Sequence, residues 1–383
     1  MGDELTDNRG VRSGALRGAL IAVAIAVAAA LAVLAARPTV ANAASFADVY
    51  NQALSGDMTR ALSILDSLDA SHWSARDSAA AECIRRTFGS PPQDEDLPPI
   101  SRRVLTAYRS YWQEVMLQRL SVKAAEANLL ASLNAILGTG VAPPAASDST
   151  SGSSGLDSLS DRAKAAIDRE GLFALTGVTS PYYELMLWKT QTPVDYRVKL
   201  PERAINVHVV FLDDFVSLGW AGYATCGRAH SGGWATKDSL YAVKSAYDVG
   251  SEAFRVSYLA HEGRHFSDYR EYPKLEQPEL EYRAKLTEIA VSDTTTYALA
   301  IGFARRTGTD RSVPHAFADY CVARDMSETL FKSGTLVTDE GKWKAVPAPR
   351  VRAAAAQLLK KSAELLKRKG AATTERFLVV AGE

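Results

Sequence analysis

The sequence predicts an α+β fold in which an all-α N-terminal region is followed by a small mixed sheet and a helical C-terminal half. Apolar residues recur three and four positions apart in residues 46–68 and 100–137, which is the spacing of amphipathic helices. Three short runs are instead rich in β-branched and aromatic residues and are predicted strands: 196–200, 207–211 and 239–243. From residue 250 onward the helical spacing returns. This segregation of helices and strands is typical of α+β proteins.

The first 43 residues have the layout of a secretory signal peptide. Residues 19–36 hold no polar side chain, basic residues precede them, and Ala41 and Ala43 form an A-x-A cleavage site. We therefore expect cleavage after Ala43 and an exported protein, either periplasmic or secreted. The alternative is an uncleaved membrane anchor, because an apolar helix of this length spans about 27 Å. Only in that case is a membrane an expected partner.

The composition restricts the class of protein. The 383 residues carry 44 Lys and Arg against 44 Asp and Glu, so the chain lacks the excess positive charge of DNA- and RNA-binding proteins. We expect no nucleic acid as a partner. Hydrophobic residues make up 47% of the chain, which is enough for a buried core and argues against a disordered protein.

The expected export determines how the three cysteines are interpreted. In an oxidising environment Cys83, Cys226 and Cys321 predict one disulfide and one free thiol, although the sequence does not select the pair. Three buried thiols are the alternative.

Two changes of composition divide the exported part. Residues 45–137 form the predicted helical N-terminal region. Residues 138–158 are polar and rich in Gly, Ser and Pro, and are predicted to be a flexible linker or an exposed loop. Residues 159–383 form the second predicted domain. Its helices are expected between prolines, at 251–271, 278–306, 315–332 and 350–368.

Residues 261–265 read His-Glu-Gly-Arg-His, an HExxH motif within a predicted helix. Residues four apart lie on one helix face, so His261 and His265 can bind one Zn²⁺. Glu262 stands beside them, where its carboxylate can act as general base towards a water on the ion. The motif therefore predicts Zn²⁺ as cofactor.

A catalytic zinc site needs a third protein ligand, and the residues alone leave several carboxylates open: Asp268, Glu271, Glu276, Glu279, Glu281 and Glu288. Glu271 is disfavoured, because a ligand six residues after His265 requires the helix to end, and no helix breaker precedes Pro273. The segment from Pro278 is predicted to be a long helix whose first turns can pack beside the motif.

HExxH followed by a helix-borne Glu resembles the gluzincin zinc metallopeptidases and, more distantly, the anthrax lethal factor-like metallopeptidases. The resemblance is carried by residues 261–265, Asp268 and the stretch from Glu281 to Glu288. It implies a zincin-like catalytic domain with ligands His261, His265 and Glu281. It also implies that Asp268 orients a ligand imidazole from outside the ligand shell, with Glu288 beside the ligands. Glu288 and Glu279 are reserve third ligands.

The donor that would stabilise the oxyanion is less defined. Lethal factor-like enzymes have a tyrosine a few residues before the third ligand, where Lys274 stands here. Tyr272 is the nearest substitute and His315 is a second candidate; His230 and Tyr282 are further alternatives.

The resemblance also concerns the segment before the motif. In gluzincins the corresponding edge strand pairs with the substrate main chain, which implies that an extended peptide adds to the sheet at residues 231–243. Trp234 and Tyr241 would then line the cleft, or they pack between the sheet and the helix.

Together these features predict an exported zinc metalloendopeptidase that hydrolyses a peptide or protein substrate with Glu262 as general base. The alternative is an exported helical binding or scaffold protein in which residues 45–137 carry the function and the zinc site is non-catalytic or degenerate.

Overall fold

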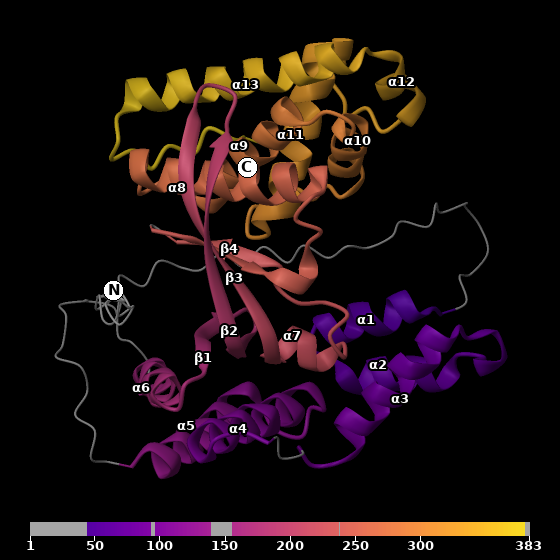
Figure 1. Cartoon of the computed structure of the whole chain (residues 1–383). Coiled ribbons are helices and arrows are strands. Elements are labelled where there is room, and N and C mark those ends of the chain that lie inside the picture. The colour runs from indigo at the N-terminus through magenta and orange to yellow at the C-terminus, as the bar shows by residue number, and fades with distance from the viewer. Residues whose placement is uncertain (1–43, 93–95, 139–154, 237, 380–383) are drawn as a thin grey trace, which may run out of the picture.

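The computed structural model describes residues 44–92, 96–138, 155–236 and 238–379. The predicted signal peptide lies outside these residues, as do positions 139–154 of the predicted linker. The α+β prediction is confirmed: N-terminal helices, a five-stranded mixed sheet and a helical C-terminal half follow one another along the chain (Figure 1). Among the described helices, none combines the length and apolarity required to cross a bilayer.

The N-terminal region consists of five α-helices and one short 3₁₀ turn: α1 (Phe46–Leu54), α2 (Met58–Ser67), η1 (Ala70–His72), α3 (Ala75–Gly89), α4 (Pro99–Met116) and α5 (Val122–Leu137). Each predicted amphipathic stretch is thus a pair of helices. The first pair separates at Gly56, whose φ of +83° favours glycine. Polar side chains fix the helix starts: the Asp57 carboxylate accepts from the Arg60 amide, and Ser74 forms a capping box with Asp77.

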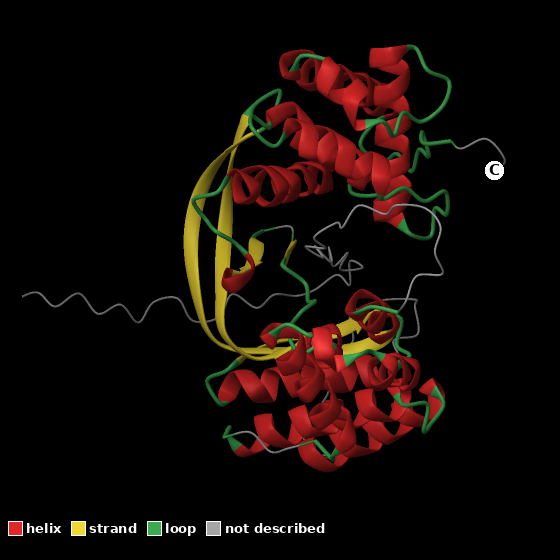
Figure 2. Ribbon diagram, turned by 90° about the vertical axis from the view of Figure 1, so that its right-hand side faces the viewer, coloured by secondary structure: helices red, strands yellow, loops and turns green. Residues whose placement is uncertain are grey.

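Five strands form one sheet in the order β1-β2-β3-β5-β4: β1 (Phe173–Thr179), β2 (Tyr182–Lys199), β3 (Ala204–Leu218), β4 (Gly233–Ala235) and β5 (Leu240–Val243). Only the β3–β5 pair is parallel. Strands β2 and β3 form a long curved ribbon that reaches from the N-terminal helices to the C-terminal ones (Figure 2). The predicted strands overlap β2, β3 and β5, whereas β1, β4 and most of β2 and β3 were not predicted.

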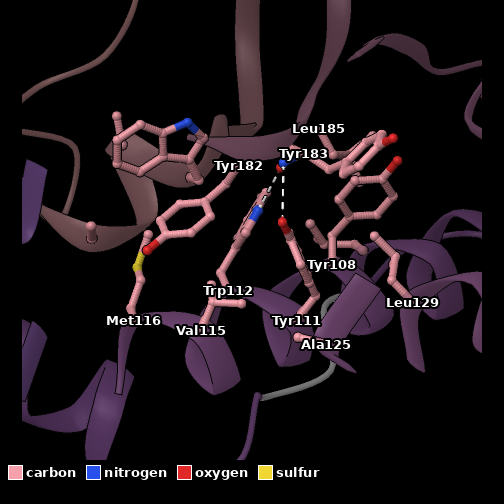
Figure 3. Packing of buried hydrophobic residues seen from close by; sticks show 14 of the residues in the cluster. Tyr108, Tyr111, Trp112, Val115, Met116, Ala125, Leu129, Tyr182, Tyr183 and Leu185 are labelled. Atoms are coloured by element: carbon pink, nitrogen blue, oxygen red, sulfur yellow. Dashed lines mark hydrogen bonds between the residues drawn. The ribbon is translucent and has the colours of Figure 1, made fainter. Parts of the chain in front are cut away.

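Helix α6 (Gly155–Arg169) begins inside the predicted linker. One hydrophobic cluster contains buried residues from both sides of residue 159, the predicted domain boundary. Aromatic residues of α4 pack on β2 within this cluster (Figure 3). The indole of Trp112 donates to the carbonyl of Tyr183 at 2.8 Å, and the Tyr183 amide donates to the Tyr111 hydroxyl at 3.3 Å. The N-terminal helices therefore share one core with β1 and the first half of β2.

A disulfide reinforces this union. It joins Cys83 of α3 to Cys226, just after the short helix α7 (Gly219–Ala224), across 143 positions of sequence. Cys321 is a buried free thiol, so the predicted arrangement of one disulfide and one free cysteine is confirmed.

The C-terminal half comprises α8 (His261–Glu271), α9 (Gln277–Val291), α10 (Thr296–Arg305), α11 (Pro314–Phe331), α12 (Glu340–Ala345) and α13 (Ala348–Lys369). The short 3₁₀ turn η2 (Lys244–Ala246) and the π-helical segment η3 (Phe254–Ala260) precede α8. The predicted single helix 278–306 is interrupted before α10, where the Glu252 carboxylate accepts from the amide of Thr294 at 2.9 Å.

Helix α9 lies among α8, α11 and α13 and is buried around its circumference from Pro278 to Ile289 (Figure 1). Its charged side chains are consequently paired inside the protein: Glu279 with Arg311, Arg283 with Asp268, Lys285 with Asp319 and Glu288 with His261. Buried charges require such partners.

Candidate metal centre

Helix α8 presents both motif histidines on one buried face. His261 and His265 are 6% and 5% exposed, and their Nε2 atoms lie 3.1 Å apart. The helix sits close against the β2–β3 ribbon at Gly263, where an added Cβ would lie 3.3 Å from Cγ1 of Val198. The small residue inside the motif thus allows the sheet to support the helix that carries the two imidazoles.

Glu281 of α9 joins His261 and His265 in a group of three side chains, here termed the metal group. Its Oε1 lies 3.3 Å from Nε2 of His265 and its Oε2 lies 3.5 Å from Nε2 of His261. Ligand atoms of a tetrahedral site with bonds of about 2.0–2.1 Å lie about 3.3 Å apart. The spacing of the three side chains therefore fits one zinc-sized cation.

The electrostatics of the group favour a cation as well. Burial raises the pKa of the Glu281 carboxyl, but His265, His261 and His315 outweigh it and hold that pKa well below its usual range. Burial lowers the pKa of His261, but the nearby carboxylates of Glu281 and Glu288 outweigh it and hold that pKa well above its usual value. Without a metal, a proton on His261 neutralises the buried carboxylates; a divalent cation would take over this role.

Glu288 holds the imidazole of His261 in its orientation. Nδ1 of His261 donates to its Oε1 at 2.7 Å, which leaves Nε2 to face Glu281. The structure differs from expectation at Asp268, whose carboxylate binds the guanidinium of Arg283 at 2.7 and 2.9 Å. Nδ1 of His265 has no hydrogen-bond partner among the residues that the structure describes. Asp268 is diverted because a buried arginine faces it from α9.

The other carboxylates considered as third ligand are engaged elsewhere. Glu279 accepts from Arg311 at 2.6 Å, and Glu271 pairs with Arg203. Glu288 approaches Nδ1 of His261 rather than Nε2.

Glu262 is buried at 6% exposure, yet its carboxylate has no hydrogen bond or ion pair within the described part of the chain. Two tyrosines lie close enough for its charge to affect them. Burial, followed by the charge of Glu262, raises the pKa of Tyr247 and of Tyr258. The Tyr258 hydroxyl is buried and has no hydrogen-bond partner among the described residues. The carboxylate thus faces protonated phenols and keeps its oxygens available for a water.

A third tyrosine flanks the histidines. The Tyr269 ring stacks on His265 with centroids 6.0 Å apart, and burial raises its pKa to about 12. Tyr247, Tyr258 and Tyr269 were not predicted from the sequence. Helical spacing could have indicated Tyr269, which is four residues after His265, whereas Tyr247 reaches the site only through the fold.

Of the predicted oxyanion donors, His315 contacts the metal group. It stands in the first turn of α11, and its Nδ1 lies 2.9 Å from Oε2 of Glu281. Tyr272 packs at the end of α8 with Leu275, Leu280 and Leu366.

The two further alternatives are bound elsewhere. Nδ1 of His230 lies 2.8 Å from the carbonyl of Ser231, and the Tyr282 hydroxyl donates to Asp325 at 2.7 Å.

Strand β4 forms one edge of the sheet and lies beside α8. Gly233 is required there, because an added Cβ would lie 2.2 Å from the carbonyl oxygen of Tyr241 and 2.8 Å from the Tyr258 ring. Trp234 is 4% exposed and stacks on Tyr241 with centroids 5.2 Å apart. Trp234 therefore packs within the protein.

Within the described residues, one group of three or more His, Cys, Asp or Glu side chains could hold a metal ion, and it is His261, His265 and Glu281. No protein-family model, curated protein or solved structure matches the chain.

Proposed function

We propose that the protein is an exported zinc metalloendopeptidase of the gluzincin type. The observation that carries the proposal is the convergence of His261, His265 and Glu281 on one point, with the buried and unpaired carboxylate of Glu262 next to it. A purely structural zinc site has no use for a free base and usually has four protein ligands.

His261, His265 and Glu281 would hold the ion, which, when bound, polarises a carbonyl and makes a nearby water more acidic. Glu262 accepts a proton from that water and delivers it to the leaving nitrogen. His315 lies beside Glu281 and can donate to the carbonyl oxygen as negative charge develops there.

The edge strand supports a peptide as substrate. Strand β4 ends the sheet next to α8, so an extended chain can add to it by main-chain hydrogen bonds and pass in front of the metal group.

Export is supported by the cysteines. A disulfide between Cys83 and Cys226 persists in an oxidising compartment and would be reduced in most cytosols. With the signal peptide predicted at residues 1–43, we propose a periplasmic or secreted protein, with N-terminal membrane anchoring as the alternative.

A second candidate function is a binding or scaffold protein with a structural zinc site. The observation in its favour is His315, whose position beside Glu281 would allow it to act as a fourth ligand and close the site.

One experiment separates the two functions. Metal analysis of the purified protein should give about one zinc per chain, and Glu262→Gln should retain the zinc while abolishing cleavage of unfolded casein. If the wild-type protein binds zinc but leaves casein intact, and His315→Ala releases the metal, the site is structural. A natively folded protein that binds no zinc would exclude both the catalytic and the structural zinc site.

A further inference from the structure

A recess of about 620 Å³ lies between the loop that joins α8 to α9 and the loop that precedes α11. Arg376 of the C-terminal tail also lines it. Six lining residues are polar or charged, namely Lys274, Glu276, Gln277, Arg311, Ser312 and Arg376, and the other four are apolar, namely Pro273, Leu275, Pro278 and Pro314. A volume of this size accommodates one or two side chains of a bound peptide.

Two residues that line the recess are close in the chain to residues of the metal group or in contact with it. Pro314 lines it, and the next residue is His315, whose Nδ1 lies 2.9 Å from Glu281. Gln277 also lines it and begins α9, the helix that carries Glu281 about one turn later. A substrate that passes the metal group can therefore place a neighbouring side chain in the recess.

Positive charge exceeds negative charge in this recess. The charge of Arg311 is neutralised mainly by the buried Glu279, which does not line the recess and whose Oε1 lies 2.6 Å from Nη2 of Arg311. Glu276 accepts from Arg376 at 2.8 Å. Lys274 is exposed and has no ion pair among the described residues. Arg311 also approaches Glu276, at 3.3 Å, so three lining cations, Lys274, Arg311 and Arg376, are matched by one lining carboxylate.

We propose that this recess is a substrate subsite that binds a carboxylate close to the scissile peptide bond. The inference rests on the proposed peptidase function and gives it a substrate class. Lys274 supplies the uncompensated charge, and Arg376 can turn from Glu276 to the ligand because an exposed ion pair costs little to exchange. The carboxylate is either an Asp or Glu side chain or the C-terminus of the substrate.

The cleavage preference tests this subsite. The protein is incubated with a mixture of unstructured peptides, and the cleaved bonds are read by mass spectrometry. We expect Asp or Glu to be enriched about threefold to tenfold at one fixed position from the cleaved bond. If the bound carboxylate is instead the C-terminus, cleavage occurs at a fixed distance from it and is suppressed by C-terminal amidation.

Variants assign the preference to the recess. Lys274→Gln and Arg376→Gln should each reduce the enrichment, whereas Lys123→Gln, an exposed lysine on α5, should leave it unchanged. Cleavage without acidic or C-terminal preference overturns the subsite and leaves the peptidase function intact. So does a preference that survives both recess variants.

A binding measurement keeps the subsite testable if no peptide is cleaved. Fluorescently labelled pentaglutamate and pentaglutamine, each with a free or an amidated C-terminus, are titrated against zinc-loaded Glu262→Gln protein. Anisotropy should report tighter binding of pentaglutamate, by about threefold or more, that weakens in 0.5 M salt and in Lys274→Gln. Amidation lowers the affinity of both peptides if the C-terminus is the ligand. Equal affinity of all four peptides overturns the inference.

Discussion

Nδ1 of His261 lies 2.7 Å from Oε1 of Glu288, which is 27 residues later in the chain and on the neighbouring helix. This contact fixes which imidazole nitrogen faces Glu281. Glu288→Ala should therefore weaken zinc binding about 10- to 100-fold, the usual effect of losing a group that orients a ligand. Glu281→Ala should weaken it more, because it removes a ligand. Competition with a chromogenic chelator measures both affinities, and the opposite ranking would make Glu288 the third ligand.

The Tyr258 hydroxyl should matter for turnover rather than for stability. It is buried without a hydrogen bond beside Glu262, so Tyr258→Phe removes an unsatisfied polar group and should keep or raise the free energy of unfolding. If the hydroxyl donates to the substrate or to Glu262 during the reaction, kcat falls at least tenfold while the zinc content stays constant. Tyr223→Phe is a control far from the metal group. An unchanged kcat in Tyr258→Phe would assign this hydroxyl no part in catalysis.

Asp268 should behave as a structural residue. Its carboxylate neutralises the buried guanidinium of Arg283, so Asp268→Asn leaves an unpaired charge and should cost about 3–5 kcal/mol of stability. Zinc affinity of the folded variant should change far less than in Glu288→Ala. Urea denaturation and chelator competition provide the two measurements; a stable variant with weak zinc binding would restore the role expected from the resemblance.

Glu184 should make stability depend on pH. Burial, opposed by hydrogen bonds from the amides of Trp220 and Leu185, raises the pKa of its carboxyl from 4.5 to about 7. The folded protein therefore holds a proton that the unfolded chain releases between these values. The stability that this proton provides is complete below about pH 4.5 and is lost as the pH rises to about 7, a change of about 3 kcal/mol.

Urea denaturation at pH 5 and pH 8 measures this effect. Glu184→Gln should lose less stability than the wild type between the two pH values, because an amide does not titrate. Equal losses in both proteins would mean that Glu184 is ionised throughout this range.

The chain from residue 159 onward should not fold by itself. Removing α1–α5 would expose Tyr182, Tyr183 and Leu185, which pack on α4, and would eliminate the disulfide to Cys226 (Figure 3). Circular dichroism and zinc titration of this fragment should report an unfolded or aggregating protein with no specific zinc binding. A folded fragment that binds zinc would show that the predicted boundary at 159 separates independent domains.

Local sequence was sufficient for the part of the metal centre that lies on one helix. Residues four apart face the same way on any α-helix, so His261 and His265 could be paired without knowledge of the fold. The same periodicity predicted most of the C-terminal helices. It did not predict β1 and much of β2, where Tyr182 to Trp188 form one continuous buried run rather than an alternating one.

The sequence narrowed the candidates for the third ligand to a few carboxylates but did not select one of them. The reserve carboxylates Glu279 and Glu288 lie on the same helix as Glu281, and only the packing of α9 on α8 directs one of them towards Nε2 of both histidines. Contact of α9 with the loop before α11 pairs Glu279 with Arg311. Local spacing along the chain does not indicate which of several charged neighbours will be nearest after folding.

By itself, then, the sequence determined the fold class, the histidine pair, the carboxylate next to it and the number of cysteines available for a disulfide, because each follows from local spacing or composition. Tertiary structure alone decided that Glu281 faces both imidazoles, that Arg283 captures Asp268 and that Tyr247 approaches Glu262. It also decided that the N-terminal helices share a core with the sheet. These are contacts between segments distant in the chain, and they are set by the burial of apolar surface and the pairing of buried charges in three dimensions.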